Sequence, residues 1–349
     1  MAHDSEPTPN FDRYARQVRF AALGDDGQRR LGGAKALLCG CGALGSAIAH
    51  LLVRAGIGAL RIVDRDFVEA SNLPRQSLFD EDDARVGAPK AVAAAEHLRR
   101  INSDVRLDPI VADIEPSNIE RFCDGVGLIL DGTDNFETRF LINDAAIARG
   151  LPWIYGGCVG AEGRTMTIVP GETACLRCLM PECPAPGVAE TCETAGILGP
   201  IVGAIASIEA CEAIKILSGR VDAISRDLTV VDLWRNQTRR IDVRSLRDQV
   251  DCPACRHEEL VWLAGRQGHR TAVLCGRNAV QLSHPGASVS LERLAEKLSG
   301  VGPVVCNPHL LRLKVEGFEI TVFADARAIV AGTSDVAAAR AVYAKYIGH

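Results

Sequence analysis

The sequence predicts an α/β protein with a doubly wound, mostly parallel sheet and a small C-terminal α+β module. Three observations lead to this prediction. A glycine-rich turn joins an apolar run to a helical pattern within residues 36–55, strand-like and helix-like patterns alternate from residue 36 to about residue 170, and the composition changes after residue 255. Such alternation is typical of parallel strands joined by helices. We divide the chain into residues 1–258 and residues 259–349.

The glycine-rich turn follows a strand predicted at residues 36–39. Gly40, Gly42 and Gly45 have the G-x-G-x-x-G spacing, and a helix is predicted over residues 46–55. In such turns the first glycine permits the bend, the second lets phosphates approach the backbone, and the third lets the helix pack on the strand. The positive end of the helix then faces an anion. The turn therefore indicates a nucleotide site in a Rossmann-like fold.

An acidic residue at the end of the next strand supports the nucleotide site. The strand predicted at residues 60–63 ends in Asp64, about 20 residues after the last glycine, where a ribose hydroxyl is expected. The fingerprint and Asp64 fit an NAD-dependent oxidoreductase as well as they fit an enzyme that uses ATP. Residues elsewhere in the chain are needed to distinguish the oxidoreductase from the enzyme that uses ATP.

The remaining elements are read from apolar periodicity and from turn residues. In the first part we predict strands at 106–111, 128–130, 153–156 and 164–169, two strands within 227–243, and helices within 11–31 and at 90–101, 137–149 and 197–217. In the C-terminal module we predict strands at 272–282, 310–315 and 319–323 and helices at 291–298 and 336–347.

The composition excludes several functional classes. The 349 residues carry a net charge of −5, which gives no electrostatic reason to expect nucleic acid or an anionic membrane as the main partner. The first thirty or so residues lack a signal-peptide core, and no apolar run is long enough to span a membrane. We therefore expect a cytoplasmic protein. For its thirteen cysteines metal binding or catalysis is favoured over disulfides, and many of them, among apolar neighbours, are expected to have no function of their own.

Polar residues after the second strand favour a triphosphate over the single pyrophosphate of NAD. Asp66, Asn72, Arg75 and Gln76 follow within one polar stretch, and Lys90 begins a predicted helix. Asparagine, arginine, glutamine and lysine side chains together supply hydrogen bonds and positive charge for phosphates. The simpler alternative is a polar surface loop.

A second acidic turn follows the strand at 128–130. It places Asp134 and Asn135 at the carboxyl end of that strand. A carboxylate in this position can hold Mg²⁺ against nucleotide phosphates. The alternative is that two acids in a turn are solvated caps.

Two cysteine pairs predict a metal centre. Each pair has the C-x-x-C spacing, and together they supply Cys175, Cys178, Cys252 and Cys255. Two such hooks form a closed site of the kind typical of structural Zn²⁺. The metal would tie the loop after residue 169 to the segment that leaves the domain. A redox role is a weaker alternative, because neither pair opens a helix in a thioredoxin-like context.

One further cysteine, Cys192, is a candidate nucleophile. It lies on an irregular loop just before the helix predicted at 197–217, where a thiolate would feel the positive helix end. Cys183 and Cys158 are rival candidates.

These motifs together resemble the MoeB/ThiF-type adenylyltransferases, bacterial relatives of the ubiquitin-activating enzymes. The resemblance covers about residues 14–256 and is carried by eight features in order: Arg13-Tyr-Ala-Arg16-Gln17, Gly40-Cys-Gly-Ala-Leu-Gly45, Asp64-Arg-Asp66, Ser71-Asn-Leu-Pro-Arg-Gln76, Lys90, Asp131-Gly-Thr-Asp-Asn135, the two C-x-x-C pairs and Thr191-Cys192. The C-terminal module shows no rhodanese-type cysteine loop, which leaves open where a sulfur donor would dock.

The resemblance implies that ATP and Mg²⁺ activate the C-terminal Gly-Gly carboxylate of a small ubiquitin-like sulfur-carrier protein, giving an acyl adenylate and pyrophosphate. It implies a homodimer in which Arg16 reaches the γ-phosphate bound by the partner subunit. It also implies that Cys192 forms a thioester or persulfide with the carrier, as the matching cysteine does in some members.

The same resemblance assigns the nucleotide contacts. Asp64 would hold the ribose and Asp134 the Mg²⁺, and Asp66 and Asn135 belong to the same binding motifs. The phosphates would be held by Asn72, Arg75, Gln76 and Lys90. Two alternatives stay open: an NAD-dependent oxidoreductase, and a catalytically silent scaffold in a carrier-protein complex.

Overall fold

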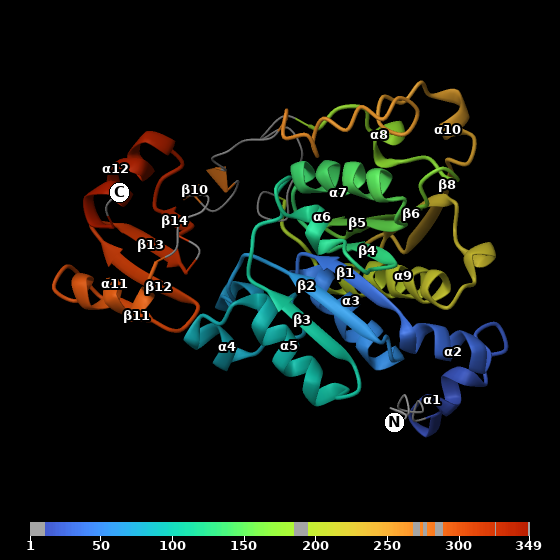
Figure 1. Cartoon of the computed structure of the whole chain (residues 1–349), viewed down its shortest axis with the longest axis horizontal. Helices are drawn as coiled ribbons and strands as arrows, with labels where there is room; N and C mark the ends of the chain where they lie inside the picture. Colours follow the sequence, from blue (N-terminus) through green and yellow to red (C-terminus); the bar gives the residue numbers. More distant parts are fainter. Residues whose placement is uncertain are drawn as a thin grey trace, which may run out of the picture. The chain divides into compact units, whose positions relative to one another are not determined.

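The computed structural model describes residues 11–184, 195–267, 273–274, 278–282, 289–324 and 326–347. These residues form two compact units, one ending at residue 267 and one made of the described residues beyond it (Figure 1). The predicted division of the chain after residue 258 stays a prediction. Within the described residues, no helix is both long and apolar enough to cross a bilayer.

The first unit is built on an eight-stranded sheet with the strand order β3-β2-β1-β4-β5-β6-β7-β8. Pairing is parallel from β3 to β5 and antiparallel from β5 to β8. The strands are β1 (Lys35–Cys39), β2 (Ala59–Val63), β3 (Arg106–Ile110), β4 (Leu128–Asp131), β5 (Trp153–Val159), β6 (Glu162–Ile168), β7 (Asp227–Asp232) and β8 (Gln237–Asp242). The predicted doubly wound, mostly parallel sheet is confirmed.

The predicted helical regions of this unit are all observed, but four short helices, α4, α6, α8 and α10, were not predicted. Helix α3 begins at Ala43 rather than at Ser46, because Gly42 already serves as its N-cap. Helix α4 was not predicted, since it buries no residue and is stabilised by Asp80, whose side chain caps it. The helices are α1 (Phe11–Val18), α2 (Gly24–Gly33), α3 (Ala43–Ala55), α4 (Glu81–Val86), α5 (Lys90–Ile101), α6 (Ile119–Phe122), α7 (Phe136–Arg149), α8 (Leu176–Leu179), α9 (Gly199–Leu217) and α10 (Leu246–Gln249).

Two hydrophobic cores cover the two faces of this sheet. Side chains alternate along a strand, so Ala36 and Leu38 of β1 enter the core that holds α3, α5 and α9, whereas Leu37 and Cys39 enter the core that holds α6 and α7. Figure 1 shows the same arrangement, with α6 and α7 on one side of the sheet and α3 and α9 on the other. Burial on both faces explains the uninterrupted apolar run in the sequence of β1.

The strand order reverses between β1 and β4. From β1 the chain moves outward through β2 and β3, then returns to place β4 on the other side of β1. Cys39, the last residue of β1, is paired with Asp131, the last residue of β4. Ligands of doubly wound proteins bind outside the carboxyl ends of the strands at such a reversal. The fold therefore brings the glycine turn and the acidic turn to one place.

The second unit contains a six-stranded antiparallel sheet with the order β11-β12-β13-β14-β10-β9. Its elements are β9 (Val273–Leu274), β10 (Ala279–Leu282), α11 (Leu291–Leu298), β11 (Val304–Cys306), β12 (Leu310–Val315), β13 (Phe318–Phe323), β14 (Ala328–Ala331) and α12 (Val336–Tyr346). The single strand predicted at 272–282 was wrong, because β9 and β10 are separate and pair with each other. Strands β11 and β14 were not predicted, since runs of three and four residues carry little periodicity.

Candidate functional site

The glycine turn after β1 is shaped by two close backbone approaches. Gly40 has a φ of +85°, and a Cβ on it would lie 2.8 Å from the carbonyl oxygen of Gly132. A Cβ on Gly45 would lie 2.1 Å from the oxygen of Gly40. Gly42 differs, since its added Cβ would meet nothing nearer than Gln76 Nε2 at 3.8 Å. The backbone is therefore open at Gly42, where phosphates are expected to approach.

Gly132 belongs to the same arrangement, and the sequence analysis missed it as a site residue. A Cβ on Gly132 would lie 2.4 Å from the oxygen of Gly40 and 2.8 Å from the Cα of Gly45. The turns after β1 and β4 thus pack backbone against backbone. A glycine directly after an acid at the end of a strand was the available signal.

The acidic residues after β2 form a charge cluster with Lys90. Asp64 accepts hydrogen bonds from the backbone N–H of Cys41 and of Asp66, both at 2.6 Å. Burial raises the pKa of Asp64, while Lys90 opposes that shift. Lys90 begins α5, is almost fully buried, and lies 3.1 Å from a carboxylate oxygen of Asp66. Asp64 is therefore fixed in place beside the glycine turn.

A second ion pair fixes the far side of this cluster. Arg65 donates to both carboxylate oxygens of Asp113 at 3.0 Å. Burial alone would lower the pKa of Arg65, but Asp113, Asp66 and Asp134 raise it, so the guanidinium stays charged. Arg65 was not among the predicted site residues, although it lies between two that were.

The loop that follows contains three predicted phosphate ligands. The Asn72 side chain accepts a hydrogen bond from the Glu69 N–H at 3.2 Å, and Arg75 donates to the Ser71 carbonyl at 2.7 Å. Gln76 is buried, and its Oε1 has no partner among the described residues. A buried amide oxygen left unpaired is costly, so Gln76 beside the open backbone of Gly42 indicates a place for a polar ligand.

The turn after β4 presents one acid and buries another. Asp131 is fully buried and accepts hydrogen bonds from Thr133 N at 2.9 Å and from Thr133 Oγ1 at 2.7 Å. Asp134 is exposed, with no hydrogen bond or ion pair to any residue in the described parts of the chain. Asn135 caps α7 by accepting from Thr138 N at 2.8 Å. Among these residues only Asp134 has a carboxylate available to a cation.

A buried acid on α9, Glu209, was not predicted. It has no exposed surface, neither of its carboxyl oxygens has a partner among the described residues, and a Cβ on Gly156 would lie 1.8 Å from Oε1. Burial raises the pKa of Glu209 well above 4.5, with Asp131 adding to the shift and Arg139 opposing it. Burial thus favours the protonated, neutral form of Glu209 in the folded protein. Two acids within an otherwise apolar helix, Glu209 and Glu212, were the available sequence signal.

We expect Glu209→Gln to stabilise the protein increasingly as the pH rises. Above pH 4.5 the unfolded chain releases the proton of Glu209, whereas the folded wild type keeps it. The free energy of unfolding of the wild type therefore falls as the pH rises, by at most about 1.4 kcal/mol per pH unit. This fall ends at the pKa that Glu209 has in the folded protein. The glutamine variant has no such loss. Urea unfolding at pH 5 and pH 8 measures the difference between variant and wild type. A difference that stays constant over this range would contradict a neutral Glu209.

The two cysteine hooks meet, as the sequence predicts. The Sγ–Sγ separations are 3.6 Å for Cys175 and Cys252, 3.8 Å for Cys175 and Cys178, and 3.4 Å for Cys178 and Cys255. Four sulfurs about 2.3 Å from a tetrahedral Zn²⁺ would be separated by about 3.8 Å. A disulfide would need about 2.05 Å. The cluster therefore fits a single zinc ion and excludes disulfides between these pairs.

Helix α7 accepts hydrogen bonds from the chain within the first C-x-x-C pair and from the chain that follows the second. The Asn143 side chain accepts a hydrogen bond from Leu176 N at 2.9 Å, within the first hook. The Asp144 side chain accepts from Trp262 N at 2.9 Å and from Leu263 N at 3.3 Å, just beyond the second hook. Two adjacent side chains of one helix thus fix segments that lie far apart in the sequence.

Within the described residues of one chain, two of the predicted catalytic residues are not seen at this site. Arg16 lies on α1, is exposed, and has no hydrogen bond or ion pair within those residues. Cys192 lies outside the described residues. The rival Cys183 is half-buried, and burial raises its pKa to about 11. Cys158 is half-buried near the end of β5.

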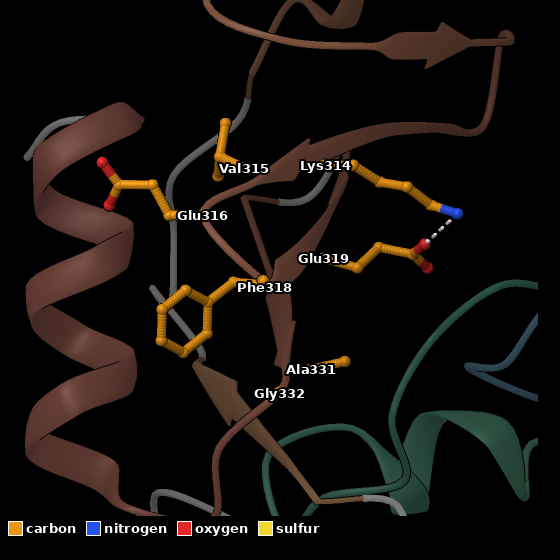
Figure 2. Close-up of a pocket in the computed structure, with 8 residues that line it drawn as sticks. Lys314, Val315, Glu316, Phe318, Glu319, Ala331 and Gly332 are labelled. Atoms are coloured by element: carbon orange, nitrogen blue, oxygen red, sulfur yellow. Dashed lines mark ion pairs between the residues drawn. The ribbon is translucent and has the colours of Figure 1, made fainter.

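The second unit has a shallow hollow of about 460 Å³ at the turn between β12 and β13 (Figure 2). Lys314 and Glu319 face each other there as an ion pair at 3.4 Å, and the Phe318 ring forms part of the lining. The two charges neutralise each other, and the hollow contains no cluster of nucleophilic or metal-binding groups. We place the candidate site at the reversal between β1 and β4 in the first unit.

Comparison with known proteins identifies the family. The model of the ThiF family matches residues 14–254. The chain belongs to the ThiF family. This ThiF-family chain is 43% identical over 338 residues to the sulfur carrier protein ThiS adenylyltransferase of Bacillus subtilis, a match that covers 96% of this chain and 99% of that protein. The match takes in the second unit as well, which the predicted resemblance over residues 14–256 did not.

Two further relatives match about 70% of this chain. The SAMP-activating enzyme E1 of Haloferax volcanii is 37% identical over 70% of this chain and 88% of its own length. The adenylyltransferase and sulfurtransferase MOCS3 of Xenopus laevis is 36% identical over 71% of this chain, and the match spans about half of that protein, 54%. A crystal structure of E. coli MccB with ATP has a TM-score of 0.58 at 23% identity, covers 67% of this chain and 72% of that one, and shows the shared fold.

Proposed function

We propose that this adenylyltransferase activates the C-terminal Gly-Gly carboxylate of a small ubiquitin-like sulfur-carrier protein with ATP. The observation that carries the proposal is the packing, at the reversal between β1 and β4, of the glycine turn against the turn that carries the exposed acid Asp134. Relatives that match most of the chain are named for sulfur-carrier activation, among them the Bacillus subtilis enzyme. The comparisons give no support to an NAD-dependent oxidoreductase or to a silent scaffold.

In the proposed reaction an oxygen of the carrier carboxylate attacks the α-phosphorus of ATP. A new P–O bond forms, the bond between the α-phosphorus and the bridging oxygen breaks, and pyrophosphate leaves. The nucleophile is already an anion, so alignment and charge neutralisation matter more than a general base. Arg75 and Lys90 supply positive charge, and Asp64 holds the ribose. Asp134 is the residue that would hold a Mg²⁺ ion, which would supply positive charge to neutralise the phosphates.

The proposal is tested by ATP–pyrophosphate exchange. We expect exchange only when a carrier ending in Gly-Gly is present, because its carboxylate is the nucleophile. The matched control is the same carrier without its last glycine. Exchange that proceeds without carrier, or binding of NAD in place of ATP, would reject the proposed function.

We expect Cys192 to act after adenylation. Its thiolate would attack the acyl adenylate, form a thioester with the carrier and release AMP. Cys192→Ser should then keep pyrophosphate exchange but lose any covalent adduct with the carrier. Mass spectrometry of the protein after incubation with carrier and ATP measures the adduct. Cys183→Ser is the control, because the raised pKa of that thiol leaves little thiolate at neutral pH. An adduct that survives Cys192→Ser contradicts the assignment.

We also propose that the active site is shared in a homodimer, with Arg16 completing the phosphate site of the partner. Arg16 is exposed on α1, without a partner among the described residues, so it is free to serve a neighbouring subunit. Arg16→Ala and Asp134→Ala homodimers should both be inactive. A mixed dimer should regain up to half of the wild-type activity per enzyme, because one of its two sites has both residues. Exchanged dimers that stay inactive would rule out the shared site.

A further inference from the structure

The residue that holds the acidic turn in place is Arg139, which the sequence analysis did not single out. It is buried on the second turn of α7 and donates from Nε to Asp131 at 3.0 Å. Its Nη2 donates to the Thr133 carbonyl at 2.7 Å and to the Gly156 carbonyl at 2.9 Å. One side chain thus joins the end of β4, the turn after it, and strand β5.

Aromatic rings and neighbouring charges restrict Arg139 further. Its guanidinium carbon lies 5.2 Å from the centre of the Phe136 ring and 5.4 Å from that of the Tyr155 ring. Burial alone would lower the pKa of Arg139, but Asp131 and its neighbours raise it, so the side chain stays charged. Glu209, a second buried acid on α9, has no hydrogen-bond partner for either carboxyl oxygen among the described residues. Arg139 thus donates to the carboxylate of Asp131 and not to that of Glu209.

The bond to Thr133 bears directly on Asp134. The Thr133 carbonyl belongs to the peptide that leads into Asp134, so Arg139 fixes the backbone on which this carboxylate is mounted. Asp131, which bonds both the N–H and the hydroxyl of Thr133, fixes the other side of the same residue. The turn is held by buried groups, whereas Asp134 itself is exposed.

We propose that Arg139 is a positioning residue that sets the Asp134 carboxylate for the cation that accompanies ATP. The inference rests on the proposed function. A metal ligand must be held to within about half an ångström, and a turn with one exposed acid needs support from a second layer of side chains. Arg139 provides that support through three acceptors within the protein, and its own side chain is buried.

Nucleotide binding with and without Mg²⁺ tests the inference in the full-length protein. The probe is ATP, and its dissociation constant is measured by calorimetry in excess Mg²⁺ and in EDTA. The ratio of the two constants is the Mg²⁺ effect. We expect Arg139→Gln to reduce this effect by about tenfold, the equivalent of one charge-assisted hydrogen bond, with binding in EDTA nearly unchanged. Arg139→Lys keeps the charge but cannot reach three acceptors, so its Mg²⁺ effect should lie between that of the wild type and that of Arg139→Gln.

A double-mutant cycle separates positioning from general stability. If Arg139 acts through Asp134, the double variant Arg139→Gln with Asp134→Ala should show the same Mg²⁺ effect as Asp134→Ala alone. Arg149→Gln is the matched control, because Arg149 is an exposed arginine at the end of the same helix. Thermal unfolding and zinc content show which variants are folded. If Arg139→Gln does not fold, Arg139→Lys decides.

Three results would each overturn the inference. The first is a folded Arg139 variant that keeps the full Mg²⁺ effect. The second is a variant that weakens ATP binding equally in Mg²⁺ and in EDTA, and the third is a loss of the Mg²⁺ effect that adds to the loss caused by Asp134→Ala. Failure of the proposed function looks different, because the wild type itself would then lack ATP binding or carrier-dependent exchange.

Discussion

Asp134→Ala is expected to abolish carrier-dependent ATP–pyrophosphate exchange, with a loss of at least about 10²–10³-fold, the range found when one preorganised electrostatic group is removed. Asp134 is the exposed acid of the turn after β4, at the reversal of strand order. Without it the metal would be held by phosphates alone, and the charge that develops on the leaving pyrophosphate would be less well neutralised. Initial exchange rates at saturating ATP and carrier measure the effect.

Two variants make this result specific. Asp134→Asn keeps the size and one oxygen ligand but removes the charge, so it should retain part of the activity and need more Mg²⁺. Asp222→Ala removes an exposed acid from another turn of the same unit and should leave the exchange unchanged. Wild-type exchange in Asp134→Ala would remove the basis for the proposed metal site.

Loss of the metal from the cysteine cluster is expected to destabilise the first unit by several kcal/mol. Zinc binding to structural sites is worth about 10–16 kcal/mol in small domains, which exceeds the net stability of most proteins. The cluster joins segments near residues 175 and 252, which are otherwise connected by hydrogen bonds to α7 and by the bond from Arg177 to the Glu259 carbonyl. Cys252→Ser should therefore lower the midpoint of thermal unfolding by about 10 °C or more.

Elemental analysis provides the direct measurement, and we expect one zinc per chain. Cys211→Ser is the control, because Cys211 is an exposed thiol away from the cluster. A chelator should reproduce the effect of Cys252→Ser in the wild type and have no further effect in the variant. A protein purified without metal that nevertheless unfolds at the wild-type temperature would disprove a structural zinc.

The sequence was most informative where chemistry and spacing coincide. The turn from β1 into α3 could be predicted because three glycines have separate steric roles, and the cysteine cluster could be predicted because two identical hooks imply a common ligand. Asp134 could be proposed as a metal ligand because it follows a buried strand. These are local signals, readable within a few residues.

What could not be predicted depends on contacts between distant segments. Arg139 looked like an ordinary helix residue, since its three acceptors come from β4, the turn and β5. Glu209 is buried only because α9 packs against the sheet at Gly156. The short strands β9 and β14 exist because neighbouring strands complete their hydrogen bonds, which no periodicity of their own reveals.

The interlocked turns after β1 and β4 also determine how this site can change in evolution. At Gly40, Gly45 and Gly132 any side chain would collide with the backbone of another of these three residues. A single substitution at one of them therefore forces that backbone to move. We expect such a variant to lose its fold before its function can change. Gly42 is different, because an alanine there would fit the folded chain and intrude only on the ligand. In a saturation scan, variation at position 42 should alter nucleotide affinity in a folded protein, while positions 40, 45 and 132 should accept no replacement. Of these four glycines, Gly42 is thus the one at which a lineage could change nucleotide binding in a single step.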